Sequence, residues 1–259
     1  MELDTIFKKI GIKSSDKIII TSNLVKILSK FKKREINFDP NTLLNNLKDK
    51  VGKKGTLFVP TYNWDFCKGK TFDYNKTRSQ TGALGNIALK RKDFIRSFNP
   101  IYSLAVAGKN NKKICNQKHV DCFSFKSPFG YLLKNNGKNL FIDTFPRWQG
   151  ETKLTGFVFH HLVEQVVGVS DRYFKNFTGK YIDKKNIKKN VKIKFYVKNL
   201  KFKYKVYIGK KIEKTLLKKN ILKEASFNGI NFSIINLKET LKILEKDLKT
   251  KNEYFLKKY

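Results

Sequence analysis

Long apolar runs are absent from this sequence. No stretch of eighteen consecutive apolar residues occurs, so we expect no membrane-spanning helix. The first residues place acidic side chains early and no apolar run follows them, which is not the pattern of a secretory signal peptide. Internal repeats and low-complexity linkers are absent too. With 40% apolar residues the chain can bury a full core, and we expect residues 1–259 to form a single domain.

Cysteine is scarce. Cys67, Cys115 and Cys122 make an odd number, so they do not form a disulfide framework, and they favour a reducing, cytoplasmic location. Cys115, His119 and Cys122 lie close together in the sequence. They supply at most three ligands, at a spacing that is not typical of structural zinc sites. We therefore expect no metal site.

Acidic residues are few compared with basic ones. The chain has 21 acidic and 56 basic residues, a formal net charge of +35. Most of the basic residues are lysines spread along the whole chain, whereas a nucleic-acid-binding protein usually gathers its basic residues on one face. Abundant Lys, Asn and Ile also match the bias of an A+T-rich genome, which we favour as the source. A non-catalytic nucleic-acid-binding protein stays an alternative. The field attracts anions and repels polycations in either case.

The hydrophobic periodicity predicts an α/β fold. Short β-branched or apolar runs bounded by turn residues predict buried strands at 16–21, 55–59, 104–107 and 138–142. Apolar residues at helical spacing predict helices at 3–10, 24–32, 40–51, 82–91, 110–118 and 130–135. Residues 66–81 show no period, and we expect a long loop of the kind that is often functional.

Beyond Gly168 the pattern changes. Residues 191–197 and 202–208 alternate with a period of two, and we expect them to pair as half-exposed strands. A helix is predicted at 211–222, and a hairpin at 225–235 with Asn228-Gly229 at its turn. Asn236 is expected to cap a final helix at 237–249.

Small polar segments follow predicted strands or precede predicted helices. They are Thr21-Ser22-Asn23-Leu24, Pro60-Thr61-Tyr62, Arg96 to Ser103, and Ser127-Pro128. Ligands in α/β sheets gather at the carboxyl ends of strands, and helix N-termini offer free backbone N–H groups to amides and phosphates. Arg96 could pair with a phosphate or form a structural ion pair. The serines are equally compatible with ordinary helix caps, and Thr61 with a turn residue.

Two of the three histidines lie in Thr155-Gly-Phe-Val-Phe-His160-His161-Leu-Val-Glu164. In a helix, His161 and Glu164 are one turn apart on the same face, whereas His160 faces elsewhere. A carboxylate so placed can fix the imidazole tautomer and stabilise the imidazolium when histidine acts as a base. An amphipathic helix with a histidine at the edge of its apolar face is the alternative interpretation.

These segments, in this order and ahead of the His-x-x-Glu motif, resemble the aminoglycoside 3-N-acetyltransferase family, also called the antibiotic N-acetyltransferase family. The similarity covers about residues 14–250, and its most specific parts are Gly55 to Thr61, Arg96-Ser97-x-x-Pro100-x-x-Ser103 and His161-x-x-Glu164. The resemblance implies an α/β/α sandwich around a central mixed sheet with a β-rich C-terminal portion. It also implies an acetyl-CoA-dependent N-acetyltransferase with His161 as general base and Glu164 as its partner.

The resemblance further implies which residues line the pantetheine and phosphate end of CoA. They are Ser22, Leu24, Thr61, Ser97 and Ser103, to which we add Asn23 and Arg96 as neighbours in the same segments. Two positions depart from the family pattern. Asn23 stands where a serine is common, and Val158 stands where a threonine usually precedes the histidine. His160 or a backbone N–H could replace the hydroxyl that would support the oxyanion.

The expected reaction is direct transfer, in which His161 removes a proton as the substrate amine attacks the thioester carbonyl of acetyl-CoA. Tyr62 and Asp65, on the loop after the second strand, are expected to contact the acceptor, although each could be structural. Since the net charge repels polycations, we expect an anionic, nucleotide-linked amino sugar of surface-glycan biosynthesis. An aminoglycoside is the alternative acceptor. We expect no nucleic-acid or membrane partner, and the oligomeric state is not predicted.

Overall fold

The computed structural model describes residues 2–144, 172–198, 204–206, 210–249 and 256–258. Its centre is a seven-stranded sheet with the order β10-β11-β6-β1-β2-β5-β4. The strands are β1 (Lys17–Ser22), β2 (Thr56–Pro60), β4 (Ile95–Arg96), β5 (Leu104–Gly108), β6 (Lys138–Ile142), β10 (Leu222–Phe227) and β11 (Ile230–Asn236). β1 runs parallel to β2 and β6, whereas β5 and β11 run antiparallel to their inner neighbours. The mixed sheet predicted from the sequence is confirmed.

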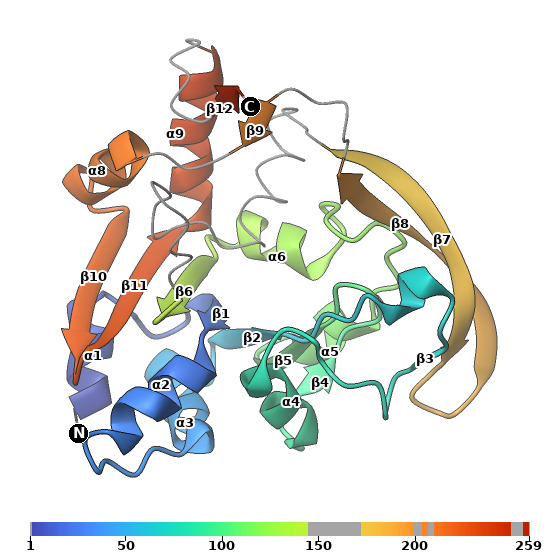
Figure 1. Cartoon of the computed structure of the whole chain (residues 1–259), viewed down its shortest axis with the longest axis horizontal. Coiled ribbons are helices and arrows are strands. Elements are labelled where there is room, and N and C mark those ends of the chain that lie inside the picture. The colour runs from blue at the N-terminus through green and yellow to red at the C-terminus, as the bar shows by residue number, and fades with distance from the viewer. Residues whose placement is uncertain (1, 145–171, 199–203, 207–209, 250–255, 259) are drawn as a thin grey trace.

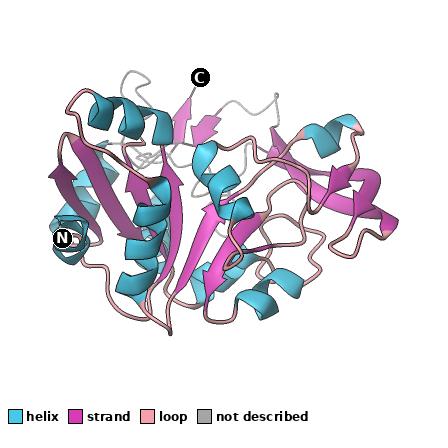
Figure 2. Ribbon diagram, turned by 90° about the horizontal axis from the view of Figure 1, so that it is seen from below, coloured by secondary structure: helices cyan, strands magenta, loops and turns pink. Residues whose placement is uncertain are grey.

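Helices cover both faces of this sheet (Figures 1 and 2). The helices of one face are α1 (Glu2–Lys9), α2 (Leu24–Lys32), α3 (Pro40–Val51) and α4 (Ala83–Lys90), and those of the other are α5 (Asn111–Asn116), α6 (Pro128–Lys134), α8 (Lys210–Lys218) and α9 (Leu237–Lys249). β1 shows why its sequence is continuously apolar: Ile18 and Ile20 enter one core and Ile19 enters the other. The α/β/α sandwich is thereby confirmed.

Helix boundaries follow the capping residues. Asp39 accepts hydrogen bonds from the backbone N–H groups of Asn41 and Thr42 at the start of α3, and Gly52 ends that helix with a positive φ of 63°. Asn236 accepts from the Glu239 N–H at 2.9 Å at the start of α9. The predicted spans 24–32, 40–51, 138–142 and 237–249 agree with α2, α3, β6 and α9.

A long two-stranded ribbon stands beside the main sheet, at the right of Figure 1. β7 (Arg172–Ile182) pairs antiparallel with β8 (Lys188–Lys198) along its whole length, and β3 (Phe72–Asp73) adds a short third strand. The predicted pairing of 191–197 with 202–208 is therefore wrong. β8 pairs with a strand that the sequence did not predict, and β9 (Tyr204–Val206) pairs with β12 (Leu256–Lys258).

The sequence did not predict β7 because the inner face of the ribbon is shaped by contacts that the alternation of apolar and polar residues does not reveal. Gly179 of β7 lies where a Cβ atom would come within 2.8 Å of the Phe66 ring, so this strand needs glycine at a core-facing position. Phe66 belongs to the 3₁₀ helix η1 (Asp65–Lys68), inside the loop predicted at 66–81. Among the described residues, no helix combines the length and the apolar character that crossing a bilayer requires.

Candidate functional site

A pocket lies where β1 and β2 end. Its volume is about 360 Å³, within the range of small-molecule sites. Thr21 and Ser22 line it from β1, and Tyr62 and Trp64 line it from the chain that follows β2. Because the carboxyl ends of parallel strands meet at one edge of a sheet, two segments that are forty residues apart in sequence share one cavity.

The third wall of the pocket is the start of α4. Thr81, Leu84 and Gly85 line it there. A Cβ atom on Gly85 would lie 2.8 Å from the Ser79 hydroxyl oxygen and closer still to the Pro60 carbonyl oxygen. Glycine at this position therefore lets the helix approach the end of β2 and close the pocket.

The segment that joins β1 to α2 combines a pocket residue with a helix cap. Ser22 is half-buried and lines the pocket. The Asn23 side-chain oxygen accepts a hydrogen bond from the Lys26 N–H at 3.1 Å and caps α2, and Leu24 is buried in the core. The first turn of α2 contains no acidic residue. The N-terminal end of this helix therefore offers a positive dipole end beside the pocket.

Thr61 and Ser103 form the buried support behind Tyr62. Their hydroxyl oxygens are 2.9 Å apart, and neither residue is exposed. The Ser103 hydroxyl is also placed 2.8 Å from the Thr61 carbonyl oxygen, and the Thr61 N–H donates to the Ser103 carbonyl at 2.9 Å. These contacts fix the direction in which the chain leaves β2. Their predicted contact with CoA stays a prediction.

Arg96 joins this support to the loop on the other side. Its Nε donates to the Ser103 hydroxyl at 3.0 Å and one Nη donates to the Thr61 carbonyl at 3.2 Å. The other Nη donates to the carbonyls of Thr77 at 2.5 Å and Tyr74 at 3.4 Å. The guanidinium thus holds three chain segments together through neutral groups.

The charge of Arg96 is buried with only 4% of the residue exposed. The guanidinium carbon lies 4.5 Å from the centroid of the Phe72 ring, a cation–π contact. Burial lowers the pKa of Arg96 to about 10, so the group stays charged at neutral pH. No carboxylate forms an ion pair with it among the described residues. Ser97, its neighbour, is buried and accepts from the Leu104 N–H at 2.9 Å.

Tyr62 and Trp64 form the aromatic wall of the pocket. Tyr62 contacts Tyr102 with ring centroids 4.8 Å apart and Trp64 with centroids 6.4 Å apart. Burial, with a smaller contribution from Tyr102, raises the pKa of Tyr62 well above its usual value, so the phenol stays neutral. Tyr62 is only 2% exposed and its hydroxyl is buried, so this wall offers a ligand mainly apolar surface, which suits a sugar ring or the pantetheine arm.

Asp65 lies at the start of η1, next to this wall. Its carboxylate is 3.1 Å from the Lys70 ammonium and 4.0 Å from that of Lys68. The hydrogen bond from Lys70 is the main reason that the pKa of Asp65 is lowered. A cationic acceptor would have to displace these lysines before it could pair with Asp65.

Sequence reasoning missed two polar pairs at the same edge of the sheet. Thr21 donates to the Asn139 side-chain oxygen at 3.1 Å, and Asn139 is fully buried in β6 with an Nδ2 that has no hydrogen-bond partner among the described residues. Lys30 of α2 donates to the buried Asp143 carboxylate at 2.7 Å, directly after β6. A polar residue inside an apolar strand was the available signal for Asn139.

The predicted catalytic pair lies outside the described residues. This applies to His161 and Glu164, and also to His160 and Val158. Cys115 donates to the Ile95 carbonyl at 3.2 Å and Cys122 contacts the Asn99 side chain. Within the described ranges, no group of three or more His, Cys, Asp or Glu residues could hold a metal ion.

The model of the aminoglycoside 3-N-acetyltransferase family matches residues 28–249. This range includes β2, the pocket residues Tyr62 and Trp64 that follow it, and the His-x-x-Glu segment. The chain belongs to this family. Its membership makes the chain an acyl-CoA-dependent N-acetyltransferase that uses acetyl-CoA as the acyl donor. No curated protein matches the sequence.

Solved structures of aminoglycoside acetyltransferases share the fold. AAC-VIa bound to sisomicin has a TM-score of 0.72 at 16% identity, over 96% of this chain and 97% of that chain. AAC-IIIb in a binary complex with CoASH has a TM-score of 0.71 at 16% identity, over 96% and 95%. A histidine-to-alanine mutant of AAC(3)-IVa in complex with apramycin has a TM-score of 0.69 at 15% identity, over 96% and 91%.

Proposed function

We propose that the chain transfers the acetyl group of acetyl-CoA to an amine of an aminoglycoside. Family membership carries this proposal, because the family is described by that reaction. The sisomicin and apramycin complexes of the structural neighbours support an aminoglycoside as the acceptor. The pocket at the ends of β1 and β2 supports it from this chain, since an aromatic wall stands there beside small polar groups.

In the proposed reaction, His161 removes a proton from the acceptor amine as the nitrogen attacks the thioester carbonyl. The C–S bond then breaks, the acetyl group forms an amide with the amine, and the CoA thiolate leaves. Glu164 holds the imidazole and offsets the charge of the imidazolium.

We further propose that acetyl-CoA, the acyl donor, binds beside the N-terminal end of α2. Ser22 lines the pocket there, and the free N–H groups and dipole of a nine-residue helix favour the phosphates and amides of CoA. Four other predicted donor-site residues lie behind the pocket wall and do not line the pocket: Thr61, Arg96, Ser97 and Ser103. They are buried and form hydrogen bonds to one another or to backbone groups. Their role in this proposal is to shape the pocket wall.

A nucleotide-linked amino sugar is the second candidate acceptor, as an intermediate of surface-glycan biosynthesis. Charge favours it. The formal net charge is +35, and Asp65, which follows Trp64 in the sequence, is paired with Lys70 and Lys68. An anionic substrate is attracted by such a field, whereas an aminoglycoside is repelled.

Steady-state kinetics with acetyl-CoA discriminate the two candidates. We would compare kcat/KM for kanamycin, gentamicin and sisomicin with kcat/KM for UDP- and dTDP-linked amino sugars at one ionic strength. A higher value for an aminoglycoside supports the first candidate. A higher value for a nucleotide sugar replaces it with the second, and an absence of acetyl transfer to every amine contradicts both.

A further inference from the structure

A second cavity lies between α5 and α6, on the face of the sheet opposite α2 and α4. Its volume is about 440 Å³. It shares no lining residue with the pocket at the ends of β1 and β2. Its floor includes the buried Ile114 of α5 and the ring of Tyr131 of α6, which packs against Phe58 of β2 with ring centroids 6.1 Å apart. The described residues therefore line two separate cavities.

Among the described residues that line this cavity, four are lysines and none is acidic. They are Lys113, Lys118, Lys126 and Lys134. None of the four forms an ion pair with a carboxylate of the described residues. Four ammonium groups that share one concave space repel one another, so an anion that enters it gains from all of them at once.

The remaining lining supplies a flat apolar surface and amide groups. Phe125 is 54% exposed at the cavity, and the Lys134 ammonium lies 5.7 Å from the centroid of its ring. Asn110 donates to the Tyr131 hydroxyl at 3.4 Å, and Gln117 brings a second amide. An exposed ring beside cationic groups can stack on a base while the lysines contact a phosphate.

We propose that this cavity binds a nucleoside phosphate. The lysines would hold the phosphate, Phe125 would stack on the base, and the amides would meet its polar edge. The volume suits a mononucleotide rather than inorganic phosphate alone. The inference concerns binding and does not depend on which amine the enzyme acetylates.

Calorimetric titration with AMP tests the proposal on the full chain. The titration is made in saturating CoA, so that the donor site is already occupied. AMP should bind with one site per chain. The double variant Lys113→Glu/Lys134→Glu should weaken this binding by about tenfold or more, since each reversed charge repels the phosphate.

A charge-matched control separates a built site from the overall positive field. Lys90→Glu/Lys92→Glu makes the same change in net charge at two exposed lysines next to the end of α4, on the opposite face. This control should change AMP affinity by about twofold or less, because distant exposed charges are screened. Equal weakening by both double variants would show that AMP senses only the net charge, and would overturn the proposal.

Phe125 supplies a second test that leaves the charges intact. Phe125→Ala should weaken AMP binding by roughly tenfold, the loss of one base–aromatic stack, and should leave binding of inorganic phosphate unchanged. Melting temperatures and circular dichroism of every variant show whether the fold is kept. An absence of AMP binding to the wild-type chain in saturating CoA contradicts the proposal, because it leaves no nucleotide site apart from the donor site.

Discussion

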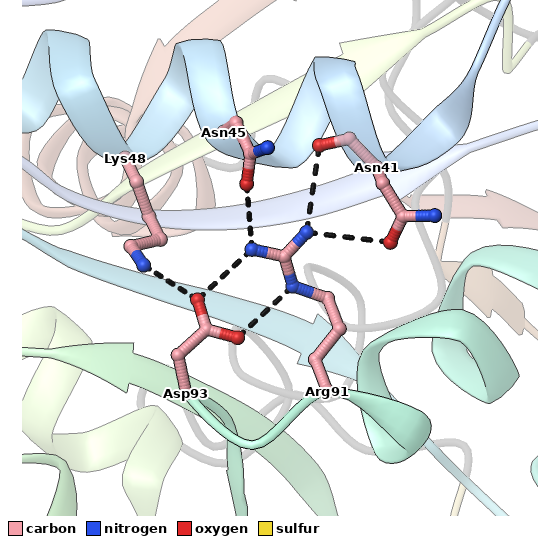
Figure 3. Close-up of polar contacts among 5 residues, drawn as sticks. All are labelled: Asn41, Asn45, Lys48, Arg91 and Asp93. Carbon is pink, nitrogen blue, oxygen red and sulfur yellow. Dashed lines mark hydrogen bonds and ion pairs between the residues drawn. The ribbon is translucent and has the colours of Figure 1, made fainter.

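Two arginines of this protein have different hydrogen-bond partners and different structural roles. Arg96 is buried and bonded only to neutral groups, at the wall of the pocket. Arg91 forms two hydrogen bonds of 3.0 Å to Asp93 and reaches Asn41 and Asn45 of α3 (Figure 3). Lys48 joins the same network through Asp93. Arg91 thus joins the segment after α4 to helix α3, whereas Arg96 lies behind Tyr62.

This difference predicts different consequences of replacing each arginine by lysine. Arg96→Lys keeps the charge but loses the planar fork, so the Thr77 carbonyl loses its donor, at about 1–3 kcal/mol, and the Thr61 carbonyl keeps only the Ser103 hydroxyl. We expect kcat/KM to fall roughly ten- to a hundredfold, because the pocket wall shifts. Arg91→Lys should lower the melting temperature yet leave kcat/KM within about twofold.

Both variants are assayed well below their melting temperatures, where the folded population is complete. The separation of kcat/KM from melting temperature is the decisive measurement. If Arg96→Lys loses no more activity than Arg91→Lys under these conditions, Arg96 acts only on stability and does not position the pocket.

His161 carries the chemical step in our proposal. We predict that His161→Ala lowers kcat by about 10²–10⁴-fold, the range for loss of a general base, with little change in CoA binding. Glu164→Gln should cost less, because it keeps a hydrogen-bonding group and loses only the charge. kcat/KM should rise with pH through the histidine range, since the imidazole must be neutral to accept the proton. An inactive His160→Ala beside a nearly normal His161→Ala would identify the other histidine.

At the scale of elements, two helix caps of the same kind have different neighbours. Asn23 caps α2 next to the pocket, and Asp39 caps α3, whose residues do not line it. Because each side chain satisfies backbone N–H groups that the helix leaves unpaired, either loss should destabilise the fold by about 0.5–2 kcal/mol.

Of the two caps, only that of α2 should affect the binding of CoA. We predict that Asn23→Ala reduces the thermal shift caused by CoA, because the first turn of α2 loses its fixed geometry beside Ser22, whereas Asp39→Ala leaves this shift unchanged. Differential scanning fluorimetry with a CoA series measures both variants. Equal CoA shifts in the two variants would place the donor away from the start of α2.

At the scale of the whole molecule, the charge makes catalysis depend on salt. The chain carries a formal +35, which repels a cationic acceptor over distances that salt shortens. Raising the ionic strength should therefore increase kcat/KM for kanamycin, by roughly threefold or more, and should decrease it for a nucleotide-linked amino sugar. If kcat/KM changes in the same direction with ionic strength for both acceptors, local groups near Asp65, and not the net charge, govern association.

The sequence by itself determined the local elements. Capping residues and apolar spacing placed α2, α3, β6 and α9 within their observed bounds, because caps and periodicity act over a few neighbouring residues. The family motifs occur in the family's order along the chain, and this order predicted the acetyltransferase fold without any tertiary contact. The location in a reducing cytoplasm and the roles of His161 and Glu164 stay predictions.

The tertiary structure decided what distant segments do to one another. Alternation identified 191–197 as a strand but not β7 as its partner, because the pattern within one strand does not specify which strand lies beside it. The sequence placed Arg96 next to a phosphate or a carboxylate, whereas the fold surrounds it with carbonyls from three segments. Thr21 and Asn139 meet only because β1 lies beside β6 in the sheet. Such contacts arise from chain topology, which no local pattern encodes.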